Sequence, residues 1–111
     1  MAGESLIPRK WTSTIRAAGE VDYAAYIDGT GTADYAATPG NRGFQMLLRA
    51  LGDDRSEVTT LSWWESLDAI RGFAGEDIEI ARYYPEDDRF LLERPPHVEH
   101  HRVVSRSDRI G

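Results

Sequence analysis

The sequence contains no cysteine among its 111 residues. It can therefore form no disulfide, no thiolate metal site and no cysteine nucleophile, which excludes several classes of enzyme. Nowhere do 18 apolar residues run together, and the first residues lack an apolar core of signal-peptide length. These absences fit a reducing compartment, so we expect a cytoplasmic protein with no membrane partner.

Positive charge is also scarce, with 13 Lys and Arg against 19 Asp and Glu and a formal net charge of −6. Binding to nucleic acid needs concentrated Lys and Arg, but no basic cluster extends beyond Pro8 to Lys10. We therefore expect no nucleic-acid partner. The glycines near residues 29–31 and 40–43 do not form a nucleotide-binding fingerprint, and no G-x-S-x-G turn occurs.

The apolar residues that are present follow two different periods. Alternation predicts strands at 10–17, 43–51, 57–64 and 97–105, whereas helical spacing predicts helices at 20–28 and 67–74 and further helical pieces at 32–37, 77–84 and 85–91. This order is the split βαβ arrangement of a ferredoxin-like α+β sandwich. The length fits a single domain over 1–111, with an arm at 1–8 and a tail at 106–111.

The segment Glu57 to Ala74 is the most informative, because an apolar run stops at Ser66 and changes to helical spacing. Ser66 is placed to cap the following helix. Within the strand, Thr60 and Trp64 share a face with small hydroxyl residues, and such a face suits a pocket wall. Threonine is also simply a good strand residue, so the same face can be ordinary core.

Three histidines, at 97, 100 and 101, lie near two glutamates and invite comparison with a metal site. Strand geometry opposes it, because His97 and His101 are separated by about 13 Å and His100 points to the other face. We expect no metal.

His100 can act as a base or donor beside a pocket, or it can be a core histidine bonded to backbone. The acidic run from Glu86 to Asp88 is interpreted as a solvated helix start.

The segments TLSWWESLDAIRGFAGED, YYPEDDRFLLE and VEHHRVV, with TPGNRG before the second strand, resemble small bacterial proteins of the antibiotic biosynthesis monooxygenase type. The resemblance spans about Trp11 to Val104. It implies a dimeric α+β barrel, in which two ferredoxin-like protomers pair their sheets face to face as a homodimer. It also implies a pocket between sheet and helices for an aromatic substrate, which reduces oxygen directly without a cofactor.

The resemblance also assigns residues. Trp64 matches a substrate-facing tryptophan, while Thr60 stands where the cofactor-free oxygenases have an asparagine, and threonine lacks the amide's paired donor and acceptor. We predict that Trp64 stacks on the substrate and that His100 is a proton acceptor or hydrogen-bond donor. The further candidates are wall donors at Tyr83 or Tyr84, binding residues at Thr60 and Arg49, and Trp63 in place of Trp64 if the opposite strand face lines the pocket.

The haem-degrading relatives are less similar, because Phe73 occupies the position of their helix tryptophan and residues 77–84 contain no axial histidine. The leading hypothesis is a cofactor-independent monooxygenase acting on an aromatic or polyketide-like small molecule. One alternative is a noncatalytic dimeric protein that binds a small molecule or serves in stress. Another is a cyclase or isomerase that uses His100 as acid and base.

Overall fold

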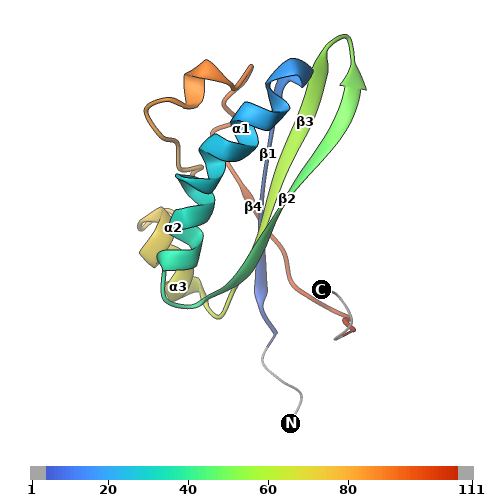
Figure 1. Cartoon of the computed structure of the whole chain (residues 1–111). Helices are drawn as coiled ribbons and strands as arrows, with labels where there is room; N and C mark the ends of the chain where they lie inside the picture. The colour runs from blue at the N-terminus through green and yellow to red at the C-terminus, as the bar shows by residue number, and fades with distance from the viewer. Residues whose placement is uncertain (1–4, 108–111) are drawn as a thin grey trace.

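The structure, a computed structural model, describes residues 5–107 (Figure 1). Over these residues a four-stranded antiparallel sheet carries its helices on one face. The strands are β1 (Ile7–Arg16), β2 (Asn41–Gly52), β3 (Arg55–Trp64) and β4 (Glu99–His100). The helices are α1 (Glu20–Asp28), α2 (Gly31–Ala37) and α3 (Leu67–Ala74), and two 3-10 turns are η1 (Ala17–Gly19) and η2 (Asp87–Arg89).

The strands lie in the order β2-β3-β1-β4. Strand β3 therefore separates β1 from β2 and is antiparallel to both of them. This interleaving is the split βαβ arrangement, so the predicted ferredoxin-like α+β fold is confirmed. Strand β1 begins at Ile7, three residues earlier than expected, so the arm before it is shorter than the predicted 1–8.

The hairpin between β2 and β3 is tighter than the expected connection at 52–56. Its turn is Asp53-Asp54, where φ is 53° and 58°. Positive φ at both central residues is typical of a type I′ turn, whose twist matches that of the strands it joins. The two strands consequently extend to Gly52 and Arg55.

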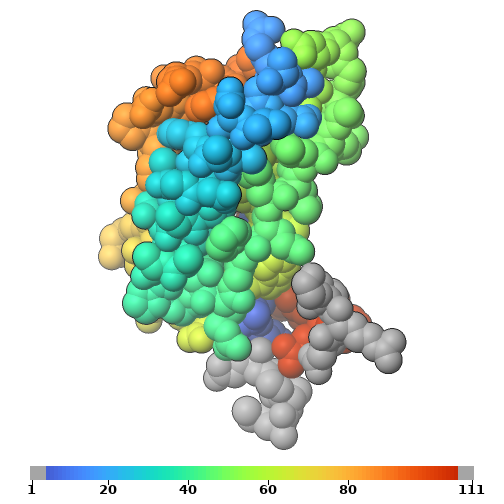
Figure 2. Space-filling view, viewed as in Figure 1, coloured from blue at the N-terminus to red at the C-terminus, as the bar shows by residue number. Residues whose placement is uncertain are grey.

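The two faces of the sheet have different surroundings. Cross-strand register places Trp11, Thr60 and Met46 in one row on the helix-covered face, as the predicted alternation requires. Trp63 alternates onto the opposite face, together with Leu47. Figure 2 shows the first two helices spread over the front of the molecule, with the hairpin projecting beside them.

Buried side chains form two clusters between the sheet and its helices. One cluster contains Ile15, Tyr23, Ile27, Val58 and Leu91. The other contains Tyr35, Trp64, Ile70 and Phe73. The Ser66 hydroxyl caps α3 by accepting from the Ala69 amide at 3.0 Å, as predicted. The buried residues of this helix are Ile70 and Phe73, whereas Leu67 is 45% exposed.

The helical piece predicted at 77–84 is wrong. This segment forms a turn at residues 78–79 and is extended beyond it, with a bridge between Ile80 and His97 and backbone bonds to residues near Pro96. The carbonyls of Ile78 and Ile80 accept from the Arg9 guanidinium instead of from a helical ladder. A contact 69 residues away in sequence thus overrides the local periodicity.

The other C-terminal elements are shorter than predicted. The expected helix at 85–91 is a single turn, η2, and the strand expected at 97–105 contains only Glu99–His100. Pro8, next to the paired residue Arg9, has no amide hydrogen, so the ladder with β1 cannot continue past it and ends in one bond from the His101 amide. Residues 1–4 of the predicted arm and 108–111 of the predicted tail lie outside the described residues.

Candidate functional site

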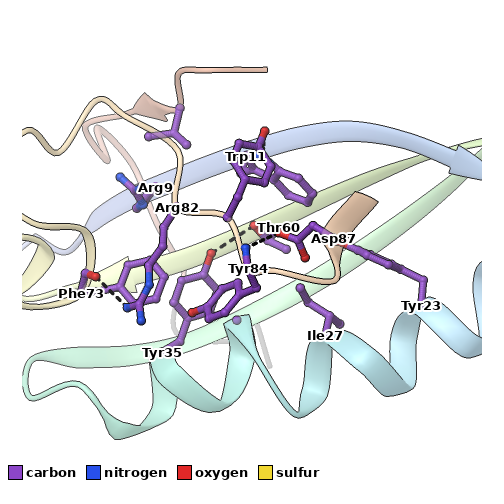
Figure 3. A pocket seen from close by; sticks show the side chains of 13 residues that line it. Arg9, Trp11, Tyr23, Ile27, Tyr35, Thr60, Phe73, Arg82, Tyr84 and Asp87 are labelled. Atoms are coloured by element: carbon purple, nitrogen blue, oxygen red, sulfur yellow. Dashed lines mark hydrogen bonds between the residues drawn. The ribbon is translucent and has the colours of Figure 1, made fainter. Parts of the chain in front are cut away.

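A cavity of about 30 Å³ lies between the sheet and the helices, where the two core clusters meet (Figure 3). Its walls combine aromatic rings, hydroxyl groups and two guanidinium groups. The chemically important lining residues are Arg9, Trp11, Tyr35, Thr60, Arg82, Tyr83, Tyr84 and Asp87. Such a mixture of apolar surface with a few polar groups is typical of a small-molecule site.

Strand alternation positions the floor of the cavity. Arg9 and Trp11 occupy successive inward positions of β1, and Thr60 lies directly opposite Trp11 on β3. Helix α2 supplies Tyr35, whose hydroxyl lies 3.3 Å from the Thr60 hydroxyl. Because both groups can donate and accept, the pair can reorient toward a bound polar group.

The roof of the cavity is the extended segment that contains Arg82, Tyr83 and Tyr84. The Trp11 indole donates to the Tyr83 hydroxyl at 3.1 Å, and that hydroxyl donates to the Pro95 carbonyl at 2.5 Å. Burial raises the pKa of Tyr83, so its hydroxyl is protonated at neutral pH. The floor and the roof are therefore joined by a hydrogen-bonded chain.

Asp34 of α2 contacts the segment that contains Arg82 and Tyr84 from the helix side. One carboxylate oxygen of Asp34 accepts from the Tyr84 hydroxyl and lies 3.1 Å from the Arg82 guanidinium. Arg82 also donates to the Phe73 carbonyl at 2.9 Å and stacks over the rings of Phe73 and Tyr84. Burial and the bond to Asp34 raise the pKa of Tyr84 well above its ordinary value.

Asp87 closes the end of the cavity near α1. It is only 4% exposed, so the interpretation of the acidic run as a solvated helix start is wrong for this residue. Its carboxylate accepts from the Tyr84 amide at 2.6 Å, which fixes the turn that begins η2. The adjacent Tyr26 hydroxyl is buried without a hydrogen-bond partner within 3.5 Å among the described residues. Burial and Asp87 raise the pKa of Tyr26 to about 12.

The structure brings together three of the predicted site residues, namely Thr60, Tyr83 and Tyr84. Trp64 lies behind this wall and is fully buried, packed against the lining residues Tyr35 and Phe73. Its indole donates to the Ser62 hydroxyl at 2.8 Å.

His100 also lies outside the cavity lining and contacts it through Arg9, at 3.1 Å. The catalytic roles predicted for Trp64 and His100 stay predictions.

Two further predicted residues lie on the opposite side of the sheet. Arg49 is exposed and pairs with Glu57 at 3.3 Å. This interaction raises the pKa of Arg49 and keeps its charge on the surface. Trp63 is half-buried and borders a separate groove of about 550 Å³, together with Leu6 and Val103. Neither side chain lines the cavity.

Sequence reasoning missed several lining residues. Arg9 could have been found by extending the strand predicted at 10–17 toward the N-terminus, because it then falls on the face of Trp11 and Ser13. Trp11 already lay on this face of the predicted strand but was not assigned to the site. Tyr35 stands in a short helix whose orientation the sequence does not reveal. Arg82 lies in a segment without regular structure and Asp87 begins the single turn η2, so no periodicity marks the side to which they point.

Two further observations bear on the type of site. Among residues 5–107, no three His, Asp or Glu side chains come together in a way that could hold a metal ion. The helices in the same part of the chain are too short and too polar to cross a membrane.

Solved structures of other proteins share this fold. A candidate antibiotic biosynthesis monooxygenase from Bacillus cereus superposes with a TM-score of 0.59 and 19% identity, over 95% of this chain and 98% of that one. A protein of unknown function from Nitrosomonas europaea has a TM-score of 0.64 and 13% identity, over 97% and 98%. SnoaB, a cofactor-independent oxygenase from Streptomyces nogalater, has a TM-score of 0.53 and 16% identity, over 98% and 100%.

No protein-family model matches the sequence, and comparison with curated proteins gives no match. At identities of 13 to 19% the structural likenesses establish the fold alone, so the chemistry has to be argued from the residues of this chain. The chain has the fold of antibiotic biosynthesis monooxygenase-type proteins, as its sequence resemblance predicts.

Proposed function

We propose that this protein is a cofactor-independent monooxygenase that acts on an aromatic or polyketide-like small molecule bound between its sheet and helices. The observation that carries the proposal is the lining of the cavity. Its rings offer stacking surface, Thr60 and Tyr83 offer hydroxyl groups, and two guanidinium groups favour an anionic ligand. The similarity of the fold to SnoaB supports the same reaction class.

The proposed chemistry places the reducing electrons in the substrate. A phenol that loses its proton becomes electron-rich, and the anion can transfer an electron to O₂ without a metal or flavin. For an anthrone, the net change is oxidation of the ring CH₂ to a carbonyl, with one oxygen atom entering the product and the other leaving as water. The protein is required to bind the phenol, stabilise its anion and accept its proton.

Residues of the cavity suit these tasks. Arg82 lies over the Phe73 ring and can contact a neighbouring anion, while Asp87 provides a buried carboxylate at the other end. Trp64 supports Tyr35 and Phe73 from behind, so its proposed part is to orient the wall on which the substrate stacks.

Binding of a polycyclic ring requires the cavity to enlarge, because about 30 Å³ holds on the order of two water molecules. The wall best able to move is the Arg82–Asp87 segment. It is extended or turn-like and is fastened by side-chain bonds, above all those to Asp34. We therefore propose that the substrate enters by displacing this segment.

Incubation with anthrone in air and under anaerobic conditions tests the reaction. We expect anthraquinone only in air, measured by chromatography, and a slower rate for Trp64→Phe than for Trp63→Phe. These variants make the same change on opposite faces of one strand. A greater loss in Trp63→Phe would move the site to the other face, and the absence of an oxygen-dependent product would refute the monooxygenase proposal.

One observation favours the alternative of a noncatalytic binding protein. The cavity is small, and Trp64, Tyr35 and Phe73 pack together as an ordinary aromatic core does. On this alternative the protein would bind an aromatic compound reversibly in air and return it unchanged. Recovery of unmodified anthrone after saturable binding would support it.

We also propose a homodimer that forms through the face of the sheet opposite the helices. Leu47 on this face is 46% exposed, and Leu61 and Trp63 beside it are half-buried. An apolar face of this kind is stabilised when a second copy covers it. The resemblance to dimeric α+β barrel proteins supports the same arrangement.

A further inference from the structure

Arg9 is a buried cation with no carboxylate in direct contact, and Glu79 acts on its charge only from beyond hydrogen-bond distance. Arg9 is 2% exposed, and its described ionic and hydrogen-bond contacts include no Asp or Glu. Its guanidinium donates to the carbonyls of Ile78 and Ile80 at 2.6 and 3.3 Å. Carbonyl groups satisfy hydrogen bonds but do not neutralise a full charge. Because burial of an unneutralised charge is costly, the position calls for a counter-ion.

His100 completes the contacts of this guanidinium. An arginine can only donate, so the His100 Nε2 atom, 3.1 Å away, must accept. The ring proton then lies on Nδ1, which donates to the Glu79 carboxylate at 3.3 Å. The geometry thus requires a neutral His100 in one tautomer. In this form His100 holds Arg9 from the side of β4.

The Arg9 side chain borders the cavity. Its guanidinium carbon lies 5.8 Å from the centre of the Phe73 ring, which is also part of the lining. Arg82 lies over the same ring, but Asp34 neutralises its charge. Figure 3 shows Arg9 and Asp87 on opposite sides of Thr60. The cavity therefore has one end where a guanidinium has no carboxylate in direct contact, Glu79 being held by His100 instead.

We propose that Arg9 binds the ionised oxygen of a phenolate ligand and that neutral His100 is a positioning residue that holds the guanidinium for it. The ligand thereby supplies a counter-ion in direct contact with Arg9, which Glu79 does not provide. This inference rests on the proposed function for the location of the site and for the aromatic class of its ligand. In this proposal His100 does not exchange a proton with the ligand; it affects binding only by holding the Arg9 guanidinium in place.

The arrangement makes binding dependent on pH. A protonated His100 would present an N–H to Arg9 and would place two cations together. The charged groups facing the ring are Arg9 from β1, Glu79 from the turn at residues 78–79 and the neighbouring His101. Burial lowers the pKa of His100 despite its bond to Glu79, so this change falls below the ordinary histidine range.

Calorimetric titration with 2,4,6-trinitrophenol tests the proposal, because this strongly acidic phenol stays ionised throughout the pH range in which a histidine of ordinary or lowered pKa titrates. Its methyl ether, 2,4,6-trinitroanisole, is a neutral control ligand. We expect the wild-type protein to prefer the phenolate and Arg9→Gln to lose roughly tenfold in phenolate affinity, the value of one charge-assisted hydrogen bond. Arg71→Gln, which removes an exposed arginine of α3, should bind as the wild type does.

The pH dependence of phenolate affinity tests the role of His100 separately. Wild-type affinity for the phenolate should fall as the pH falls below the histidine range. His100→Gln, which can still accept from Arg9 but cannot become charged, should keep its affinity there. Arg9→Lys keeps the charge but cannot reach all the present acceptors and a ligand, so it should bind more weakly. This variant keeps the test decisive if Arg9→Gln does not fold.

Several outcomes would overturn the inference. These are equal affinity for phenolate and methyl ether, unchanged phenolate affinity in folded Arg9→Lys, or the same pH dependence in His100→Gln as in the wild type. None of the binding measurements involves oxygen. Anthrone oxidation with no phenolate preference would therefore refute this inference alone, while phenolate binding without oxidation would refute the monooxygenase proposal alone.

Discussion

The hydrogen bond between the neutral His100 ring and the charged Arg9 guanidinium makes the stability of the folded protein depend on pH. Burial lowers the pKa of His100 from the ordinary value of 6.5, with Arg9 acting in the same direction and Glu79 opposing both. The unfolded chain therefore takes up the proton at a higher pH than the folded chain does. The stability contributed by neutral His100 is complete above about pH 6.5 and is lost as the pH falls toward the lowered pKa.

We accordingly expect the wild-type protein to lose stability relative to His100→Gln when the pH is lowered through this window. Urea denaturation at a series of pH values measures the difference. His101→Gln provides the matched control, since its ring is exposed and contacts Glu99 at the surface. A wild-type curve parallel to that of His100→Gln would contradict the assigned neutral state.

Trp64, which lies behind the cavity wall, also yields a prediction about stability. In Trp64→Phe the Ser62 hydroxyl, which is fully buried, loses its indole donor. An unsatisfied buried polar group costs about 1 to 3 kcal/mol, and we expect a decrease of this size in the free energy of unfolding. Urea denaturation of Trp64→Phe and of the double variant Trp64→Phe/Ser62→Ala checks this. The double variant should recover part of the loss, and no recovery would contradict the explanation.

At the scale of elements, the junction between β2 and α3 depends on close backbone approach. Gly40 has φ of +91°, and a Cβ atom there would lie 2.4 Å from the Ala69 Cβ. Gly52 has φ of +87°, but a Cβ atom there would meet nothing within 4 Å. Both Ala substitutions strain the backbone by a similar amount, whereas only Gly40→Ala also forces α3 away from the sheet.

We therefore expect Gly40→Ala to lower the free energy of unfolding by about 1 to 3 kcal/mol more than Gly52→Ala, the cost typical of overpacking. Thermal unfolding followed by circular dichroism measures both variants. Equal losses would mean that the approach of Gly40 to Ala69 does not limit the position of α3.

Elements set by local signals were predictable from the sequence, and those set by distant contacts were not. Helix α1 has the predicted bounds, and Ser66 caps α3 as expected, because both depend on neighbouring residues. The 77–84 segment was mispredicted because its carbonyls bond to Arg9. The same distinction between local and distant signals holds for the residues that line the cavity. Thr60 lies on a strand whose period identifies its face, while Asp87 begins the single turn η2, which is too short to show a period.

The irregular roof of the cavity yields another prediction at this scale. Asp34→Asn removes the negative charge that holds both Tyr84 and Arg82. The roof should then open more readily, so an aromatic ligand should associate faster, as stopped-flow quenching of tryptophan fluorescence can measure. Asp68→Asn, which disturbs an exposed pair on α3, is the control. An unchanged association rate would show that the Asp34 contacts do not limit entry.

For the whole molecule, the distribution of helices leaves the two sheet faces unequal. All three helices lie on one face (Figure 1), and no helix of residues 5–107 covers the other. The uncovered face is not simply polar, because Leu47, Leu61 and Trp63 interrupt its threonines and charges. An apolar strip of this kind on a chain of 111 residues favours association, as a small domain buries a limited share of its surface alone.

We expect the wild-type protein to sediment as a dimer and Leu47→Lys to sediment as a monomer, because a lysine buried at the pairing face would have to lose its hydration without a partner. Val21→Lys is the matched control. It introduces the same charge at a residue of α1 that is 82% exposed and lies on the helix-covered side. Analytical ultracentrifugation of the three proteins over a range of concentrations measures the change. A monomeric wild-type protein would contradict face-to-face pairing, and a monomer produced by Val21→Lys would place the interface on the helices instead.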